Sequence, residues 1–137
     1  MKTVYIISSI KNLNYEYEHL RWLRLFFLNY DYRISEDWIN HSLNIRNNRP
    51  HFKAAPNFDY MKVATQAVNE SDALVFLLSK PSTFTLTILR YALYLEKEVI
   101  VISSGPSVMQ GLEKGKESLI TSLRFSDYQK RMKELYE

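Results

Sequence analysis

The sequence predicts one doubly wound α/β domain, a parallel sheet with helices on both faces. Short runs rich in β-branched residues alternate with longer segments of helical periodicity, as in strand–helix–strand units. The runs are almost continuously apolar, as expected for strands covered on both faces. A chain of 137 residues suits a single core, so we expect one domain over residues 1–137.

The first half of the chain begins with a buried strand and an amphipathic helix. On that helix, one apolar stripe carries Leu20, Leu23, Phe26 and Phe27. A polar, Asn-rich stretch with two prolines follows later and predicts a long loop. The expected elements are a strand over 3–8, a helix over 15–29, a short strand over 32–35, a loop over 39–57 and a helix over 58–72.

The second half holds the clearest buried strand, "ALVFLLS". The helix after it should turn Ile88, Leu89, Ala92 and Leu95 inward, and Ser126 is the expected N-cap of the last helix. The expected elements are a strand over 73–79, a helix over 85–96, a strand over 98–103, a short strand over 119–125 and a helix over 127–136.

About five parallel strands suit the flavodoxin-like order 2-1-3-4-5. Ligands of open α/β sheets bind at the carboxyl ends of the strands, where the order reverses. Here this switch point lies between the first and third strands. It would bring "SSIKN" (8–12) beside "SKPSTF" (79–84), so we expect any ligand at these two loops.

Composition narrows the kind of ligand and the location. No apolar run approaches the roughly 20 residues of a membrane span, and there is no cysteine to form disulfides or thiolate–metal sites. The start, "MKTVYIISSI", lacks a signal-peptide cleavage site, so we expect a cytoplasmic protein without membrane association. The net charge of +3 is spread over scattered Lys and Arg. It favours a small anionic ligand over nucleic acid.

The two loops offer hydroxyl groups and one ammonium to such a ligand. The helix that begins near Ser82 adds free N–H groups and the positive end of its dipole, which suits phosphate. A simpler interpretation is that Ser82 or Thr83 only caps this helix. The residues concerned are Ser8, Ser9, Lys11, Ser82, Thr83 and Thr85.

The sequence lacks the common catalytic and cofactor motifs. It has no P-loop, no GxGxxG and no GxSxG, and its three histidines lack metal-ligand spacing. We therefore expect neither a metal nor another cofactor. Asp72 precedes the third strand, at the edge opposite the expected site, and is interpreted as a turn residue. Asp59 follows the long loop and could reach the site, or be a first-turn acid favoured by the helix dipole.

The order "TVYIIS", "ESD", "ALVFLLS", "KPS", "ILRYALYLEKEVIVIS" resembles the nucleoside 2-deoxyribosyltransferase superfamily over residues 3–103. The nearest branch is that of the 2′-deoxynucleoside 5′-monophosphate N-glycosidases. There a Gly-Ser-Ile-Arg loop binds the 5′-phosphate, and residues 8–11 read Ser-Ser-Ile-Lys. The resemblance also matches Tyr5 to a tyrosine that positions the catalytic carboxylate, and Pro81-Ser82 to a phosphate-binding pair.

The chain differs from this family at the position of the catalytic residue and at two glycine positions near it. The catalytic glutamate, which attacks the anomeric carbon, is replaced by Ile88, and two glycine positions hold Phe84 and Leu86. The resemblance thus implies a nucleotide- or nucleoside-binding protein without N-glycosidic cleavage and without a catalytic residue. Its implied contacts are Ser9, Lys11 and Ser82 for phosphate, with Tyr5 and Asp59 near the sugar. The family also implies a homo-oligomer.

Two alternatives stay open at this point. An active N-glycosidase or deoxyribosyltransferase could use a displaced acid, Asp59 or Asp37. A TIR-like protein-interaction domain would share the architecture, and the ten tyrosines and two tryptophans (Trp22 and Trp38) would suit an interface. The aromatic residues could equally fill the core.

Overall fold

Five parallel strands form one sheet in the order β2-β1-β3-β4-β5. The computed structural model describes residues 1–8, 13–35, 60–79, 82–104 and 115–137. The order and the parallel pairing confirm the predicted flavodoxin-like fold class. The strands are β1 (Thr3–Ile7), β2 (Arg33–Ile34), β3 (Ala73–Leu78), β4 (Val99–Ser103) and β5 (Ile120–Arg124).

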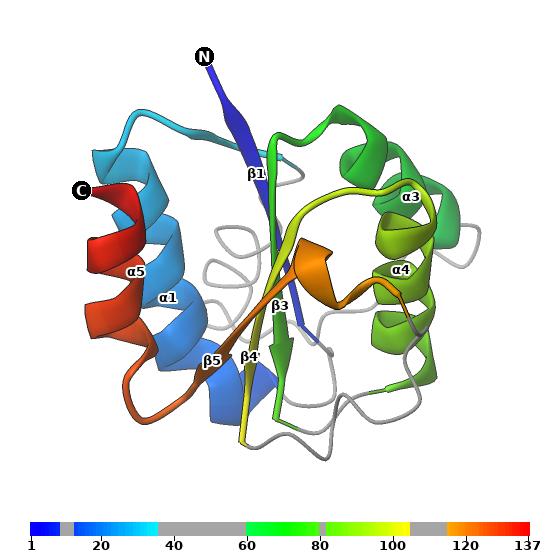
Figure 1. Ribbon diagram of the computed structural model, residues 1–137. Coiled ribbons are helices and arrows are strands. Elements are labelled where there is room, and N and C mark those ends of the chain that lie inside the picture. Colours follow the sequence, from blue (N-terminus) through cyan, green and yellow to red (C-terminus); the bar gives the residue numbers. More distant parts are fainter. Residues whose placement is uncertain (9–12, 36–59, 80–81, 105–114) are drawn as a thin grey trace.

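Helices cover both faces of this sheet (Figure 1). In Figure 1, α1 and α5 lie against one face and α3 and α4 against the other, as the right-handed crossovers of parallel strands require. None of the helices in the described residues is long and apolar enough to span a membrane. Their bounds are α1 (Leu13–Asn29), α3 (Tyr60–Glu70), α4 (Thr83–Tyr94) and α5 (Tyr128–Tyr136), with a short 3₁₀ turn η3 (Glu117–Leu119) before β5.

The helices α1, α4 and α5 begin one or two residues away from the expected positions, with α1 starting at Leu13 instead of residue 15. The helix predicted from residue 85 begins at Thr83, because Ser82 caps it. The expected Ser126 cap of the last helix is wrong: Asp127 occupies the N-cap position and makes no side-chain capping bond. A backbone turn closes there instead, with Asp127 N–H donating to the Arg124 carbonyl at 3.2 Å. The turn after β5, rather than a side chain, starts α5.

The sheet separates two hydrophobic cores. One lies between the sheet and α3/α4, and the other between the sheet and α1/α5. The predicted stripe of α1 is buried throughout, at Leu20, Leu23, Phe26 and Phe27. On α4 the buried apolar residues are Ile88, Leu89, Ala92 and Leu93, while Leu95 is only partly buried.

Several of the aromatic residues pack in or against the core between the sheet and α1/α5. Tyr136 of α5 packs edge-on against Phe27, with 5.3 Å between ring centroids, and against Phe26 at 5.7 Å. Trp22 stacks on Phe26 at 5.0 Å. Because edge-to-face and offset pairs of this kind stabilise a core, these rings serve folding. They therefore give no support to an interaction surface.

Candidate functional site

The carboxyl ends of β1 and β3 lie side by side at the predicted switch point. Ile7 pairs with Phe76 across the two strands, so the chain leaves both strands at the same edge of the sheet. From there α1 runs over one face, and α4 runs over the other (Figure 1). The two segments singled out in the sequence, 8–12 and 79–84, therefore begin next to each other.

Glu16 lies at this edge, and the sequence interpretation did not include it. Its carboxylate is fully buried, and no other Asp or Glu among the described residues is buried. Ser8, just after β1, donates its hydroxyl hydrogen to Glu16 Oε2. Ser79, just after β3, donates to Glu16 Oε1. One carboxylate from α1 thus joins the ends of two neighbouring strands.

The two serine hydroxyls explain how a carboxylate can be buried here. An ionised carboxylate outside water is strongly disfavoured unless hydrogen bonds replace its hydration. Each oxygen of Glu16 accepts one hydroxyl donor, and bonds to a charged acceptor are the stronger kind. A hydroxyl has only one hydrogen. The expected phosphate contact Ser8 therefore has no hydrogen left to donate to a phosphate while it binds Glu16.

A sequence signal for Glu16 did exist. Glu16 shares its helical stripe with Leu20, Leu23 and Phe27, all of them buried, at the spacing of one helix face. The apolar periodicity therefore placed an acid on the inward face of α1. The apolar members of the stripe predict the buried face of α1, and Glu16 is its polar member in the first turn.

Ser82 acts as the N-cap of α4. Its Oγ accepts the Thr85 N–H at 3.2 Å and lies 2.8 Å from Thr85 Oγ1. The backbone of Ser82 is extended, with φ −95° and ψ 163°, as N-caps usually are. Thr83, the first residue of the helix, is exposed. The capping interpretation of Ser82 is thus confirmed, and it does not exclude a ligand at the same hydroxyl.

The remaining expected site residues are only partly described. Tyr5 is 7% exposed and belongs to the core between the sheet and α3/α4. Ile88, at the glutamate position of the resemblance, is fully buried in the same core. Ser9, Lys11 and Asp59, together with the alternative acid Asp37, lie outside the described residues.

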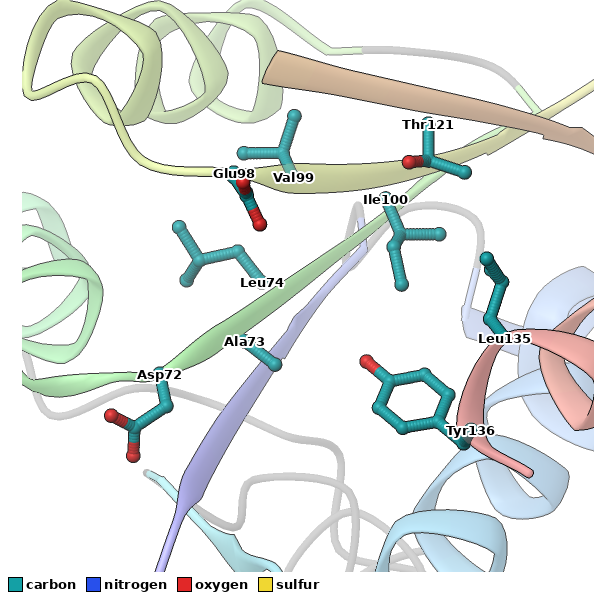
Figure 2. Close-up of a pocket in the computed structure, with 9 residues that line it drawn as sticks. All are labelled: Asp72, Ala73, Leu74, Glu98, Val99, Ile100, Thr121, Leu135 and Tyr136. Carbon is teal, nitrogen blue, oxygen red and sulfur yellow. The ribbon is translucent and has the colours of Figure 1, made fainter. Parts of the chain in front are cut away.

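A pocket of about 270 Å³ opens at the opposite edge of the sheet, where β3 and β4 begin (Figure 2). Asp72 and Glu98 line it, and Tyr136 of α5 points its hydroxyl toward the strands. Asp72 Oδ2 accepts the Thr3 N–H at 2.8 Å, which confirms it as a turn residue away from the switch point. Burial, with a smaller effect of Tyr32, raises the pKa of Tyr136 to about 12.

The described residues contain no group of three or more His, Asp or Glu side chains that could hold a metal ion. His19 has a different partner: its Nδ1 lies 2.8 Å from the Tyr128 hydroxyl. Its ring also packs against Phe125, with centroids 4.9 Å apart. This histidine links α1 to the segment that starts α5, which is a packing role.

Neither a protein-family model nor a curated protein matches this chain. Among solved structures, it is similar to the CMP N-glycosidase BcmB of Clostridium botulinum. The TM-score is 0.65, with 14% sequence identity over 98% of this chain and 97% of that chain. At this identity the similarity shows a shared fold, and it extends over nearly the full length of both chains.

Proposed function

We propose that the chain is a nucleotide- or nucleoside-binding protein of the nucleoside deoxyribosyltransferase-like superfamily that lacks N-glycosidic bond cleavage. The observation that carries this proposal is the side-by-side placement of the carboxyl ends of β1 and β3, with Ser8 and Ser79, at the switch point of the sheet, where such folds bind their ligands. Two further points support it: the resemblance over residues 3–103, and the fold shared with a CMP N-glycosidase.

The position of Ile88 supports the absence of cleavage. Family catalysis needs a carboxylate that reaches the anomeric carbon. Ile88 is an apolar residue with no exposed surface, packed in the core beneath α4. In this proposal, Ser9, Lys11, Ser82 and Thr83 contact the phosphate end of the ligand. Tyr5 and Asp59 then lie near the sugar.

Titration calorimetry with CMP, dCMP, cytidine and deoxycytidine tests this proposal. We expect saturable heat at one site per chain, with the monophosphates bound more tightly than the nucleosides. Lys11→Ala should weaken the monophosphates, and Lys133→Ala, an exposed lysine on α5, serves as its control. Absence of heat with all four compounds would contradict the proposal.

One observation favours a second candidate, an active N-glycosidase with a displaced acid. Glu16 brings a carboxylate to the switch point, although it is fully buried and both of its oxygens have hydroxyl donors. Release of free cytosine from CMP and dCMP would establish the activity. Glu16→Gln, Asp59→Asn and Asp37→Asn would then show which acid is used. A chain that binds CMP and releases no cytosine supports the first candidate.

We also propose a homo-oligomer, by analogy with the family. Leu25 and Leu28 are 48% and 38% exposed on the outer face of α1, so an apolar contact is available there. Light scattering of the purified protein gives its mass directly, and a mass of one chain would contradict this part. A cytoplasmic location, which the absence of cysteine favours, belongs to the same proposal.

A further inference from the structure

The direction of one hydroxyl group restricts what the site can bind. Ser79 is half-buried, and its hydroxyl hydrogen points to Glu16 Oε1. Ser8 is buried, and its hydrogen points to Oε2 of the same carboxylate. Of the two serines, Ser79 is thus the one that a ligand at the switch point can reach.

A serine hydroxyl that donates its only hydrogen to Glu16 has only oxygen lone pairs left for any other partner. Ser79 therefore offers an acceptor to a ligand. Turning its hydrogen outward would leave a carboxylate oxygen buried without that donor, which is strongly disfavoured. The negative charge of Glu16 adds to this preference, because it repels an anion at short range and is little screened in the interior.

We propose that Ser79, oriented by Glu16, accepts a hydrogen bond from a hydroxyl or N–H group of the ligand and keeps phosphate away from the β1/β3 junction. Glu16 is then a positioning residue that selects the neutral, hydroxyl-bearing part of a nucleoside. This inference rests on the proposed function. It refines that function by separating the sugar end of the ligand from the phosphate end.

A purely structural role is the competing explanation. Glu16 connects α1, β1 and β3, and its loss could loosen the whole edge. A loosened edge would weaken all ligands together, whereas an orienting role changes the preference between ligands. The ratio of the affinities for CMP and cytidine therefore separates the two roles.

The test measures both affinities by calorimetry for the wild-type chain, Glu16→Gln and Ser79→Ala. The glutamine removes the charge, and its NH₂ group can donate to one serine, which frees that serine's hydrogen to point outward. We expect Glu16→Gln to weaken cytidine roughly tenfold. CMP loses the same contact, but removing the negative charge also relieves its repulsion of the phosphate, so the CMP/cytidine ratio should rise up to about tenfold. Inorganic phosphate should compete with CMP better in this variant than in the wild type.

Ser79→Ala removes the acceptor and should weaken cytidine and CMP alike, because both carry the same sugar and base, whereas the affinity of inorganic phosphate, measured by competition with CMP, should stay unchanged. Ser71→Ala is the matched control. Ser71 is a buried serine near the amino end of β3, and its hydroxyl bonds the Ala67 carbonyl at 2.6 Å. Its loss should leave the ratio unchanged. Circular dichroism verifies folding, and if Glu16→Gln does not fold, Ser79→Ala decides.

Equal weakening of cytidine and CMP in Glu16→Gln, or a weakening in Ser79→Ala that includes inorganic phosphate, would overturn the inference and leave the proposed function intact. No change of affinity in either variant would overturn it as well. A wild-type chain that binds neither compound would overturn the proposed function, and this inference with it. A higher CMP/cytidine ratio in Glu16→Gln, with weaker cytidine and CMP but unchanged phosphate affinity in Ser79→Ala and no change in Ser71→Ala, would support it.

Discussion

Ser79 and Glu16 are 63 residues apart in the sequence and share a hydrogen bond at the edge of the sheet. With the bond from Ser8, this contact ties the ends of β1 and β3 to the first turn of α1. The link therefore fixes the relative position of Ser8 and Ser79, the residues that directly follow the two strands. It also makes Glu16 important for stability, independently of any ligand.

Glu16→Ala should lower the free energy of unfolding by about 2–4 kcal/mol, because it removes two charge-assisted hydrogen bonds and leaves Ser8 without its acceptor. Urea denaturation measures the change. Glu18→Ala is the control: it lies on the exposed side of the same helix and should stay within about 0.5 kcal/mol of the wild type. Equal losses of unfolding free energy in the two variants would show that the buried hydrogen bonds of Glu16 add no stability.

Ser82→Ala should lower the free energy of unfolding by about 1 kcal/mol, because the Thr85 N–H loses its capping acceptor. Ser82→Asn keeps an acceptor at the cap and should recover most of the loss. Thr83→Ala, at the exposed neighbouring position, should have little effect. A loss with Thr83→Ala as large as that with Ser82→Ala would place the cap one residue later. Thermal unfolding of the three variants decides this.

The sheet could be predicted from the sequence because buried parallel strands leave a strong local pattern. "ALVFLLS" has apolar residues at nearly every position, as a strand covered on both faces does, and it is too short for a buried helix. Strand order then followed from the alternation with helices. These features depend on neighbouring residues, so one sequence is enough to reveal them.

The polar contacts of the site could not be predicted in the same way. The bonds of Glu16 to Ser8 and Ser79 join three separate elements, and nothing in the local sequence shows which acid will meet which hydroxyl. The start of α5 is a smaller case: both Ser126 and Asp127 are good N-cap residues. The backbone turn after β5 selected Asp127, although its side chain does not cap the helix.

Tyr136 should make the fold sensitive to alkaline pH. Its pKa is raised from 10.0 to about 12, mainly by burial. Between these values the unfolded chain has lost the phenol proton and the folded chain keeps it, so stability falls as the pH rises. Tyr136→Phe removes this proton and should flatten the decline in unfolding free energy, measured with urea at several pH values from about 9 to about 12.

The control for this effect is Tyr94→Phe, because Tyr94 is 74% exposed. That variant should keep the wild-type slope. Burial also raises the pKa of Tyr128, so Tyr136→Phe should retain part of the decline. A slope in Tyr136→Phe as steep as in the wild type would mean that the Tyr136 phenol ionises equally in both states.

Ile88→Glu tests whether position 88, which the resemblance matches to a catalytic glutamate, lies in an open cleft. Ile88 has no exposed surface and lies in a core with Leu89, Ala92 and Val101. A carboxylate there would be desolvated among apolar side chains. We expect a loss of about 4 kcal/mol or more, or no folded protein, and no cytosine release from CMP. Ile88→Val, which removes one methyl group, should cost about 0.5–1.5 kcal/mol. A folded Ile88→Glu variant that releases cytosine would place position 88 in an open active site instead.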